Sequence, residues 1–499
     1  MLEAGRSATA AVQSSTPMTS LSDESVALLR HNEPAQEPLH VAADEPATAP
    51  PVEAEAAAPQ ADEIAPAVTA KRERSLLLLL AFSGFGALLL AFTFLTVHSR
   101  PSAELPANSM SARAHFETTY WLEHGYFHSA GLRVRTAPDM PVYFYRSSTG
   151  GVLLPGFIAQ KIYASITGRY SWRLMTVVHQ TLSALASAFL ALLGFRLARR
   201  IGIGPLHALA LGASLQAVHF TFPDNLMTYW ELSSRVLWLL AVCVFLLVEE
   251  RGVEKRTLAA TVIQCLAAFF MTYVEIAAGA TFLLAYALLA LLISDDRGRS
   301  AKRLLLVMFV PMLLAYGVYA MQLQAARAMH PKVPVHGSEL LFRTGLDGAS
   351  TYYGDHLDIA FGREIVRGNF PVNRPFLFRW KWLFFTGVVA LLSVLVAAVR
   401  GRLPLIATLS VSSLLGAYLI YAALFSQAVV IHPYYYDVML FTPLVLALFV
   451  LAPALVETMS VRQGVVVAAV CLLALWISMM QMRRYALQFP LPPVTQQGA

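Results

Sequence analysis

The sequence predicts an all-α polytopic membrane protein, and three observations support this fold class. Hydrophobic residues make up 57% of the chain and charged residues only 14%, far from a soluble globular average. Uncharged runs long enough to cross a bilayer recur along the chain. Most Lys and Arg residues lie in short clusters between these runs, as the positive-inside rule requires. The net charge of +6 is therefore an orientation signal and not evidence for nucleic-acid binding.

The first 70 residues predict a disordered cytoplasmic tail. They are rich in Ala, Pro, Glu, Ser and Thr, and they cannot bury enough apolar surface to offset chain entropy. No apolar segment near the start has the form of a cleavable signal peptide. The basic cluster Lys71–Arg74 precedes the first span, so we expect the tail inside and the loop after the span outside.

About eleven spans are expected in a domain covering residues 71–482, followed by a C-terminal tail at residues 483–499. The run Thr257–Ser294 as one helix would be about 57 Å long, nearly twice the hydrocarbon core, so we split it near Glu275. The expected spans are Ser75–Val97, Arg173–Gly194, Pro205–Phe222, Leu232–Val248, Thr257–Tyr273, Ile276–Ser294, Leu304–Gln322, Trp382–Val399, Pro404–Phe425, Val438–Leu455 and Gly464–Met480.

The distribution of basic residues supports this topology. Every loop placed inside contains Lys or Arg, for example Arg196–Arg200 and Asp295–Arg303, whereas the short loops placed outside contain none. Arg483 and Arg484 do not fit, because they would lie outside. We expect an integral protein of the bacterial inner membrane with a cytoplasmic N-terminus.

Two expected extracytoplasmic loops are long, at residues 98–172 and 325–381. In the first, Val152–Ile166 is apolar but interrupted by Lys161, which predicts an interfacial helix lying on the membrane. The second has a mixed polarity that predicts a small ordered cap. Cys243, Cys265 and Cys471 lie in apolar runs without metal-ligand spacing, so we expect no disulfide.

Ionisable residues collect at the expected outer ends of the spans. Such residues are costly at membrane depth and indicate a functional site, here a polar cavity open to the outer leaflet. They are His115, Glu117, Arg146, Arg173, His179, His219, Asp224, Glu231, Arg235, Glu275, His432 and Asp437.

Several stretches together resemble a known superfamily. A first span is followed by a polar loop with an acidic residue, an interfacial helix, and "Ser-Trp-Arg-Leu" opening a span that ends in "Gly-Phe-Arg-Leu-Ala-Arg-Arg-Ile-Gly". "Phe-Pro-Asp-Asn-Leu-Met-Thr-Tyr-Trp-Glu" and "His-Pro-Tyr-Tyr-Tyr-Asp" occur later. This order, over roughly Ser75 to Leu455, is similar to the GT-C membrane glycosyltransferases, in particular the protein-mannosyltransferase and aminoarabinose-transferase-like group.

The resemblance implies transfer of a sugar from a polyprenyl-phosphate carrier to a lipid or glycan acceptor on the outer face. Such chemistry needs a carboxylate base and cationic groups for the leaving phosphate. Glu117 matches the family's first-loop acidic residue, and His115 is a candidate to orient the acceptor. Many members have adjacent acidic residues where this chain has His115-Phe116-Glu117, so a divalent metal is possible but not supported, and no cofactor is expected. The candidate substrate-binding residues are Arg146, Arg173, Asp224, Tyr229, Glu231, Arg235, His432 and Tyr435.

Alternatives remain open at each of these positions. Glu117 also fits a solvated carboxylate or a helix cap, Arg146 an interface anchor, and Glu231 with Arg235 an intrahelical ion pair. Two other functions also fit the chain. One is a transporter or flippase of a lipid-linked glycan, although no two-fold repeat of hydropathy is visible. The other is a catalytically inactive envelope scaffold. In each case the partners include membrane lipids and exclude nucleic acid.

Overall fold

The computed structural model describes residues 76–89, 109–137, 140–220, 230–250, 257–293, 297–333, 335–336, 374–425, 439–440 and 442–455, with short pieces at 464–466, 468–470, 472–473 and 476. Both expected tails, residues 1–70 and 483–499, lie outside these residues. So does most of the expected second loop, including all of residues 337–373.

Helices make up most of the structure, at 89%. Within the part of the chain that the structure describes, four helices are long and apolar enough to cross a membrane: Val177–Arg200, Ile276–Ile293, Ser300–Met329 and Leu405–Leu424. Shorter apolar helices lie where further spans are expected, at Leu76–Leu89, Pro205–Val218, Leu258–Val274, Phe384–Val399 and Thr442–Ala452. The prediction of a helical membrane protein is confirmed at this level, and the number of eleven spans stays a prediction.

Most helices begin and end within a few residues of the expected spans. The main exceptions lie at four helix ends. α4 and α10 continue past Gly194 and Gln322, because the residues that follow, rich in Ala, Arg, Leu and Met, are strong helix formers. α13 begins at Arg374 and not at Trp382, and α9 extends the helix of the span expected at Leu304–Gln322 back into the expected inner loop. The helices of the expected spans are α4 (Trp172–Arg200), α5 (Pro205–Phe220), α6 (Trp230–Glu250), α7 (Leu258–Val274), α8 (Ile276–Ile293), α9 (Arg297–Leu304), a π-helical turn (Leu305–Phe309), α10 (Val310–Met329), α13 (Arg374–Val399), α14 (Leu405–Leu424) and α17 (Thr442–Leu455).

The expected break near Glu275 is confirmed. Glu275 is the single residue between α7 and α8, and its N–H still donates to the carbonyl of Met271 at 3.3 Å. Close approach of the two helices depends on Gly279, where a Cβ would lie 2.6 Å from the Cα of Thr272. This packing lets an apolar run too long for one span form two helices.

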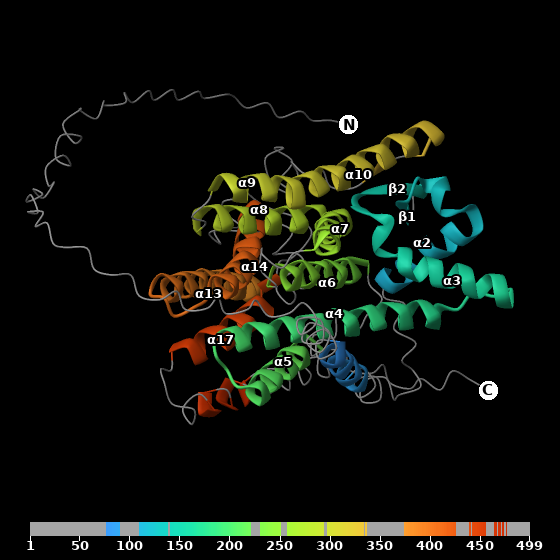
Figure 1. Cartoon of the computed structure of the whole chain (residues 1–499). Coiled ribbons are helices and arrows are strands. Elements are labelled where there is room, and N and C mark those ends of the chain that lie inside the picture. Colours follow the sequence, from blue (N-terminus) through green and yellow to red (C-terminus); the bar gives the residue numbers. More distant parts are fainter. Residues whose placement is uncertain are drawn as a thin grey trace, which may run out of the picture. The chain divides into compact units, whose positions relative to one another are not determined.

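The helices pack into one bundle, whose core is mainly aliphatic and aromatic. The most extensive contacts join α8 to α14, α4 to α5, α6 to α7 and α4 to α6. Edge-to-face contacts link Phe245 to Phe282 and Tyr286, with ring centroids 5.9 and 5.3 Å apart. Figure 1 shows α2 (Ser109–His124), β1, β2 and α3 gathered at one end of these helices.

A small sheet departs from the all-α prediction. β1 (Leu132–Ala137) pairs antiparallel with β2 (Met140–Thr149), and β3 (Val335–His336) pairs parallel with β2. The β2 sequence is rich in aromatic and β-branched residues, which favour strands. Because β3 comes from the expected second loop, the sheet joins the two polar segments that the sequence places on one side.

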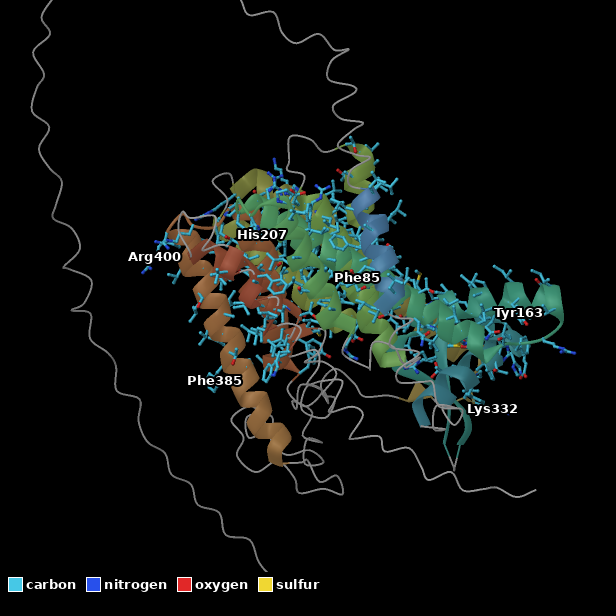
Figure 2. All side chains as sticks on the ribbon, turned by 90° about the horizontal axis from the view of Figure 1, so that it is seen from below. Phe85, Tyr163, His207, Lys332, Phe385 and Arg400 are labelled. Carbon is cyan, nitrogen blue, oxygen red and sulfur yellow. The ribbon has the colours of Figure 1, made fainter. Side chains whose placement is uncertain are left out.

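The predicted helix after the sheet is present as α3 (Leu154–Thr167), preceded by a 3₁₀ turn at Gly150–Val152. It packs beside the first turns of α4 in both views (Figures 1 and 2), and its expected place on the membrane surface stays a prediction. Gln160 fixes this hairpin: its Oε1 accepts the N–H of Ser171 at 2.9 Å, and its Nε2 donates to the Ser171 carbonyl. Ser171 in turn caps α4.

The first described helix, Leu76–Leu89, docks on α4 and α5 through one polar contact and a close fit. Gln216 Nε2 donates to the carbonyl of Phe82 at 2.9 Å and to Ser187 Oγ at 3.1 Å. The ring of Phe82 fits against Gly212, where a Cβ would lie 2.9 Å from Phe82 Cζ. A polar side chain therefore locates the first apolar helix within the bundle.

Candidate functional site

Glu117, the predicted catalytic carboxylate, is fully buried and paired. Its Oε2 accepts a hydrogen bond from Arg133 Nε at 2.9 Å, and its Oε1 accepts a second from Arg133 Nη2. Both side chains are 0% exposed. The pair has the bidentate geometry in which a planar guanidinium binds a carboxylate most strongly. Glu117 is thus neither a solvated loop carboxylate nor a helix cap.

The pair is buried because one face of α2 packs against the rest of the α2–α3 segment, which consists of the described residues 109–137 and 140–167 from the start of α2 to the end of α3. Ala114, Glu117, Thr118 and Trp121 follow helical spacing and are all buried. Thr118 Oγ1 contacts Met175 Sδ of α4 at 3.3 Å, and Trp121 Nε1 donates to Ser129 Oγ at 3.0 Å. This face therefore joins α2 both to α4 and to the turn before β1.

In this arrangement the ion pair ties α2 to β1. Each oxygen of Glu117 keeps a second lone pair, but the side chain is 0% exposed, so a substrate hydroxyl can reach the carboxylate only after this part of the structure opens. Arg133 was missed in the sequence, where it lies 16 residues from Glu117. The signal available was its position in Leu132-Arg133-Val134-Arg135, where a charge stands in a short β-prone run.

Arg146 lies in an irregular part of β2. Leu132 is opposite Thr149 but Arg133 is opposite Tyr145, so Arg146, Ser147 and Ser148 have no matching partner on β1. Such bulges redirect side chains and are common next to functional sites. The backbone of Arg146 is described and its side chain is not.

The two glycines after β2 are explained by close packing. A Cβ at Gly150 would lie 2.2 Å from the carbonyl oxygen of Gly131, and one at Gly151 would lie 2.4 Å from Tyr273 Cε1. The N–H of Gly150 donates to Gly131 at 3.1 Å, so this amide is already used and is not open to a phosphate. The Gly150-Gly151 pair seats the segment on α7.

Further polar contacts hold the segment on the bundle. Thr149 Oγ1 donates to the carbonyl of Tyr273 at 2.7 Å, and Gln322 Nε2 of α10 donates to Tyr273 Oη at 2.9 Å. Burial, followed by the neighbouring Tyr273, raises the pKa of Tyr126 above its ordinary value. These hydroxyl and amide groups act as hydrogen-bond partners that orient the segment on the bundle.

The other predicted residues are only partly described. Arg235 lies on α6 and is fully buried, and His179 lies on α4 and is 6% exposed. His179 Nε2 faces α3 where a Cβ on Gly156 would lie 3.0 Å away. His115, Arg173, His219 and Glu231 lie on described helices, but their side chains are not described. Outside the described residues lie Asp224, Tyr229, His432, Tyr435 and Asp437.

His115 and Glu117 do not share a face of α2. Residues two positions apart in an α-helix, such as 115 and 117, are separated by roughly 200° around the helix axis. The structure therefore brings Glu117 together with Arg133, and it does not bring positions 115 and 117 together on one side.

The opposite end of the bundle holds a second group of charges. Arg196 and Arg200 of α4 donate to Glu250 of α6 at 3.0 and 2.6 Å. Next to them, Glu249 accepts from Gln264 Nε2 at 2.7 Å and from Arg303. The sequence places the charged members of this group in three expected inner loops. In the structure, Glu249 and Glu250 at the end of α6 bind the arginines of the other two loops.

Neither a metal-binding group in the described residues nor a similar known protein identifies the site. Among the described residues, no group of three or more His, Cys, Asp or Glu side chains could hold a metal ion. No known protein family, curated protein or solved structure matches this chain. The function is therefore inferred from the sequence and from the geometry above.

Proposed function

We propose that this chain is a membrane glycosyltransferase that moves a sugar from a polyprenyl-phosphate donor to a lipid or glycan acceptor on the extracytoplasmic face. The observation that carries the proposal is a carboxylate and a guanidinium, Glu117 and Arg133, held in a folded segment directly on the ends of apolar helices. A lipid-linked donor presents its phosphate at this boundary between hydrocarbon and water. The reaction needs one base and at least one cation there.

In this mechanism the donor exchanges partners with the ion pair. The donor phosphate forms an ion pair with the guanidinium of Arg133, and the carboxylate of Glu117 is then no longer bound to Arg133. Glu117 accepts the proton of the acceptor hydroxyl while the oxygen of that hydroxyl attacks the anomeric carbon of the sugar. The bond from that carbon to the phosphate oxygen breaks, and the polyprenyl phosphate leaves with its charge balanced by Arg133. Charge on either partner is thereby exposed only when substrate is present.

The proposal includes the finer features of the fold and location. They are a GT-C-like arrangement of about eleven spans, an N-terminus in the cytoplasm and a place in a bacterial inner membrane. The charges at the two ends of the bundle support this orientation, because the arginine-rich ends of α4 and α9 lie opposite the α2–α3 segment.

One observation favours a second candidate, the catalytically inactive scaffold. Glu117 is 0% exposed and both of its oxygens are bonded to Arg133, as a purely structural ion pair would be. The transfer assay below separates the two functions.

The test is transfer of radiolabelled sugar from polyprenyl-phosphate donors by the purified chain in lipid vesicles. Glu117→Gln is compared with Glu123→Gln, which removes an exposed carboxylate from the same helix. We expect transfer by the wild type and by Glu123→Gln, and loss with folded Glu117→Gln. Equal transfer by both variants would remove Glu117 as the base. Absence of transfer by the wild type across several donors would favour the scaffold.

A further inference from the structure

Three histidines meet where the α2–α3 segment contacts the end of α10. His128, in the 3₁₀ turn Tyr126–Ser129, lies between the other two: its ring centroid is 4.3 Å from that of His330 and 5.6 Å from that of His124. Aromatic rings flank the group. Tyr120 stacks on His124 at 4.3 Å, and Phe144 of β2 meets His330 at 5.4 Å.

The hydrogen bonds fix which nitrogen carries a proton in two of the rings. His330 Nε2 lies 2.7 Å from the carbonyl oxygen of His128, and His124 Nδ1 lies 3.1 Å from that of Tyr120. A carbonyl oxygen only accepts, so each of these nitrogens is the donor. Neutral imidazoles therefore satisfy both bonds.

His330 also controls where the chain goes after α10. Its N–H donates to Ala326 at 3.0 Å, and its carbonyl accepts the N–H of Val333 at 3.0 Å. The chain then reaches β3, where Val335 pairs with Phe144 and His336 with Tyr145. Figure 2 places Lys332, two residues after His330, at the same end of the molecule as Tyr163 of α3. The histidines are thus the side-chain contact that precedes the junction of β3 with β2.

Acid changes the balance of charge in this group. Packing against its neighbours lowers the pKa of His128, and His330 and His124 lower it further. Among the described residues, no Asp or Glu forms an ion pair with any of the three imidazoles. The ring of Tyr120 lies 6.1 Å from that of His128, and Arg327, in the last turn of α10 before His330, is exposed. Glu123 and Lys332, next to them in sequence, are exposed. Positive charges on adjacent rings would therefore repel each other without a paired carboxylate to offset the repulsion.

We propose that His124, His128 and His330 form an acid-sensitive clasp that holds the exit of α10 and β3 against the α2–α3 segment. Neutral rings close the clasp, and protonation of adjacent rings opens it by repulsion. Because the pKa of His128 is lower in the closed form than in an unfolded chain, the closed form is fully stable above the ordinary histidine value of about 6.5 and loses stability as the pH falls below it. In the proposed topology the clasp faces the outside, where the cell does not buffer the pH.

Hydrogen–deuterium exchange of the full chain in lipid nanodiscs tests the clasp. Exchange in residues 330–336 is measured near pH 7.5 and near pH 5, corrected for the intrinsic rate at each pH. We expect the wild type to exchange roughly threefold or more faster in acid, and His128→Asn to lose most of this difference. His207→Asn is the control, because Figure 2 places His207 at the opposite end. This variant should respond to acid like the wild type.

Two results would overturn the clasp: equal protection of residues 330–336 at both pH values in the wild type, or an unchanged acid response in His128→Asn. If His128→Asn exchanges rapidly at both pH values because packing is lost, His124→Asn decides. That variant removes one end charge and leaves the bond from His330 to His128 in place. A smaller acid response in His124→Asn supports the clasp, and an unchanged response contradicts it. None of these outcomes depends on sugar transfer.

Discussion

At the scale of single residues, burial decides the role of Glu117. A carboxylate at 0% exposure is tolerated because Arg133 neutralises it and donates to both of its oxygens. The sequence singled out Glu117 but not its partner Arg133, because the pairing depends on α2 folding back on β1. Helical spacing also shows why His115 was the weaker candidate, since it does not lie on the face of Glu117.

Removing both members of the buried pair should cost less stability than the sum of the two single removals. We expect Arg133→Ala or Glu117→Ala alone to reduce the free energy of unfolding by about 3–5 kcal/mol, because each leaves an uncompensated buried charge. The double variant should lose less than the sum of the two. Thermal unfolding in detergent measures this, with Glu123→Ala as the exposed control. Additive losses in the double variant would show that the two side chains do not act as a pair.

The glycine after β2 gives a second residue-scale prediction. Gly151→Ala would place a Cβ 2.4 Å from the ring of Tyr273, so the α2–α3 segment must shift off α7. We expect a loss of about 1–3 kcal/mol, typical of overpacking. Gly317→Ala, inside α10 with no atom within 4 Å, is the matched control and should stabilise the helix by up to about 1 kcal/mol. Equal behaviour in a thermal unfolding assay would contradict the close contact.

At the scale of elements, the positions of the apolar helices follow from the sequence. A bilayer requires runs of a given length without charges, so α5, α7, α8 and α14 begin and end close to the expected spans. The sheet was missed because β1 and β3 are short and β3 depends on a partner far away in sequence.

Gln216 tests how the first apolar helix is held. Gln216→Leu removes the bonds to Phe82 and Ser187 and leaves no unsatisfied amide in their place. We expect a loss of about 1 kcal/mol, the usual range for a side-chain hydrogen bond between membrane helices. Gln264 is a poor control because it bonds a glutamate, so Thr181→Val, on an exposed part of α4, serves instead. A stability equal to that of the control variant would assign the docking of this helix to Phe82 packing alone.

At the scale of the whole molecule, the proposed function requires the two ends of the bundle to lie on opposite sides of a membrane. The helix Ser300–Met329 joins them: its first turn carries Arg303, which binds Glu249, and its last residue precedes the histidine clasp. Its 30 residues are about 45 Å long, enough to cross the hydrocarbon core. A base placed for an outer-face transferase needs the α2–α3 segment outside.

Cysteine accessibility measures this directly. In a chain whose native cysteines are replaced by alanine, Phe127→Cys places a thiol on the exposed tip of the segment, and Ala301→Cys places one at the other end of the long helix. We predict that a membrane-impermeant thiol reagent labels Phe127→Cys in intact cells and labels Ala301→Cys only after the membrane is permeabilised. Labelling of both in intact cells, or of Ala301→Cys alone, would contradict the orientation and with it the proposed site of transfer.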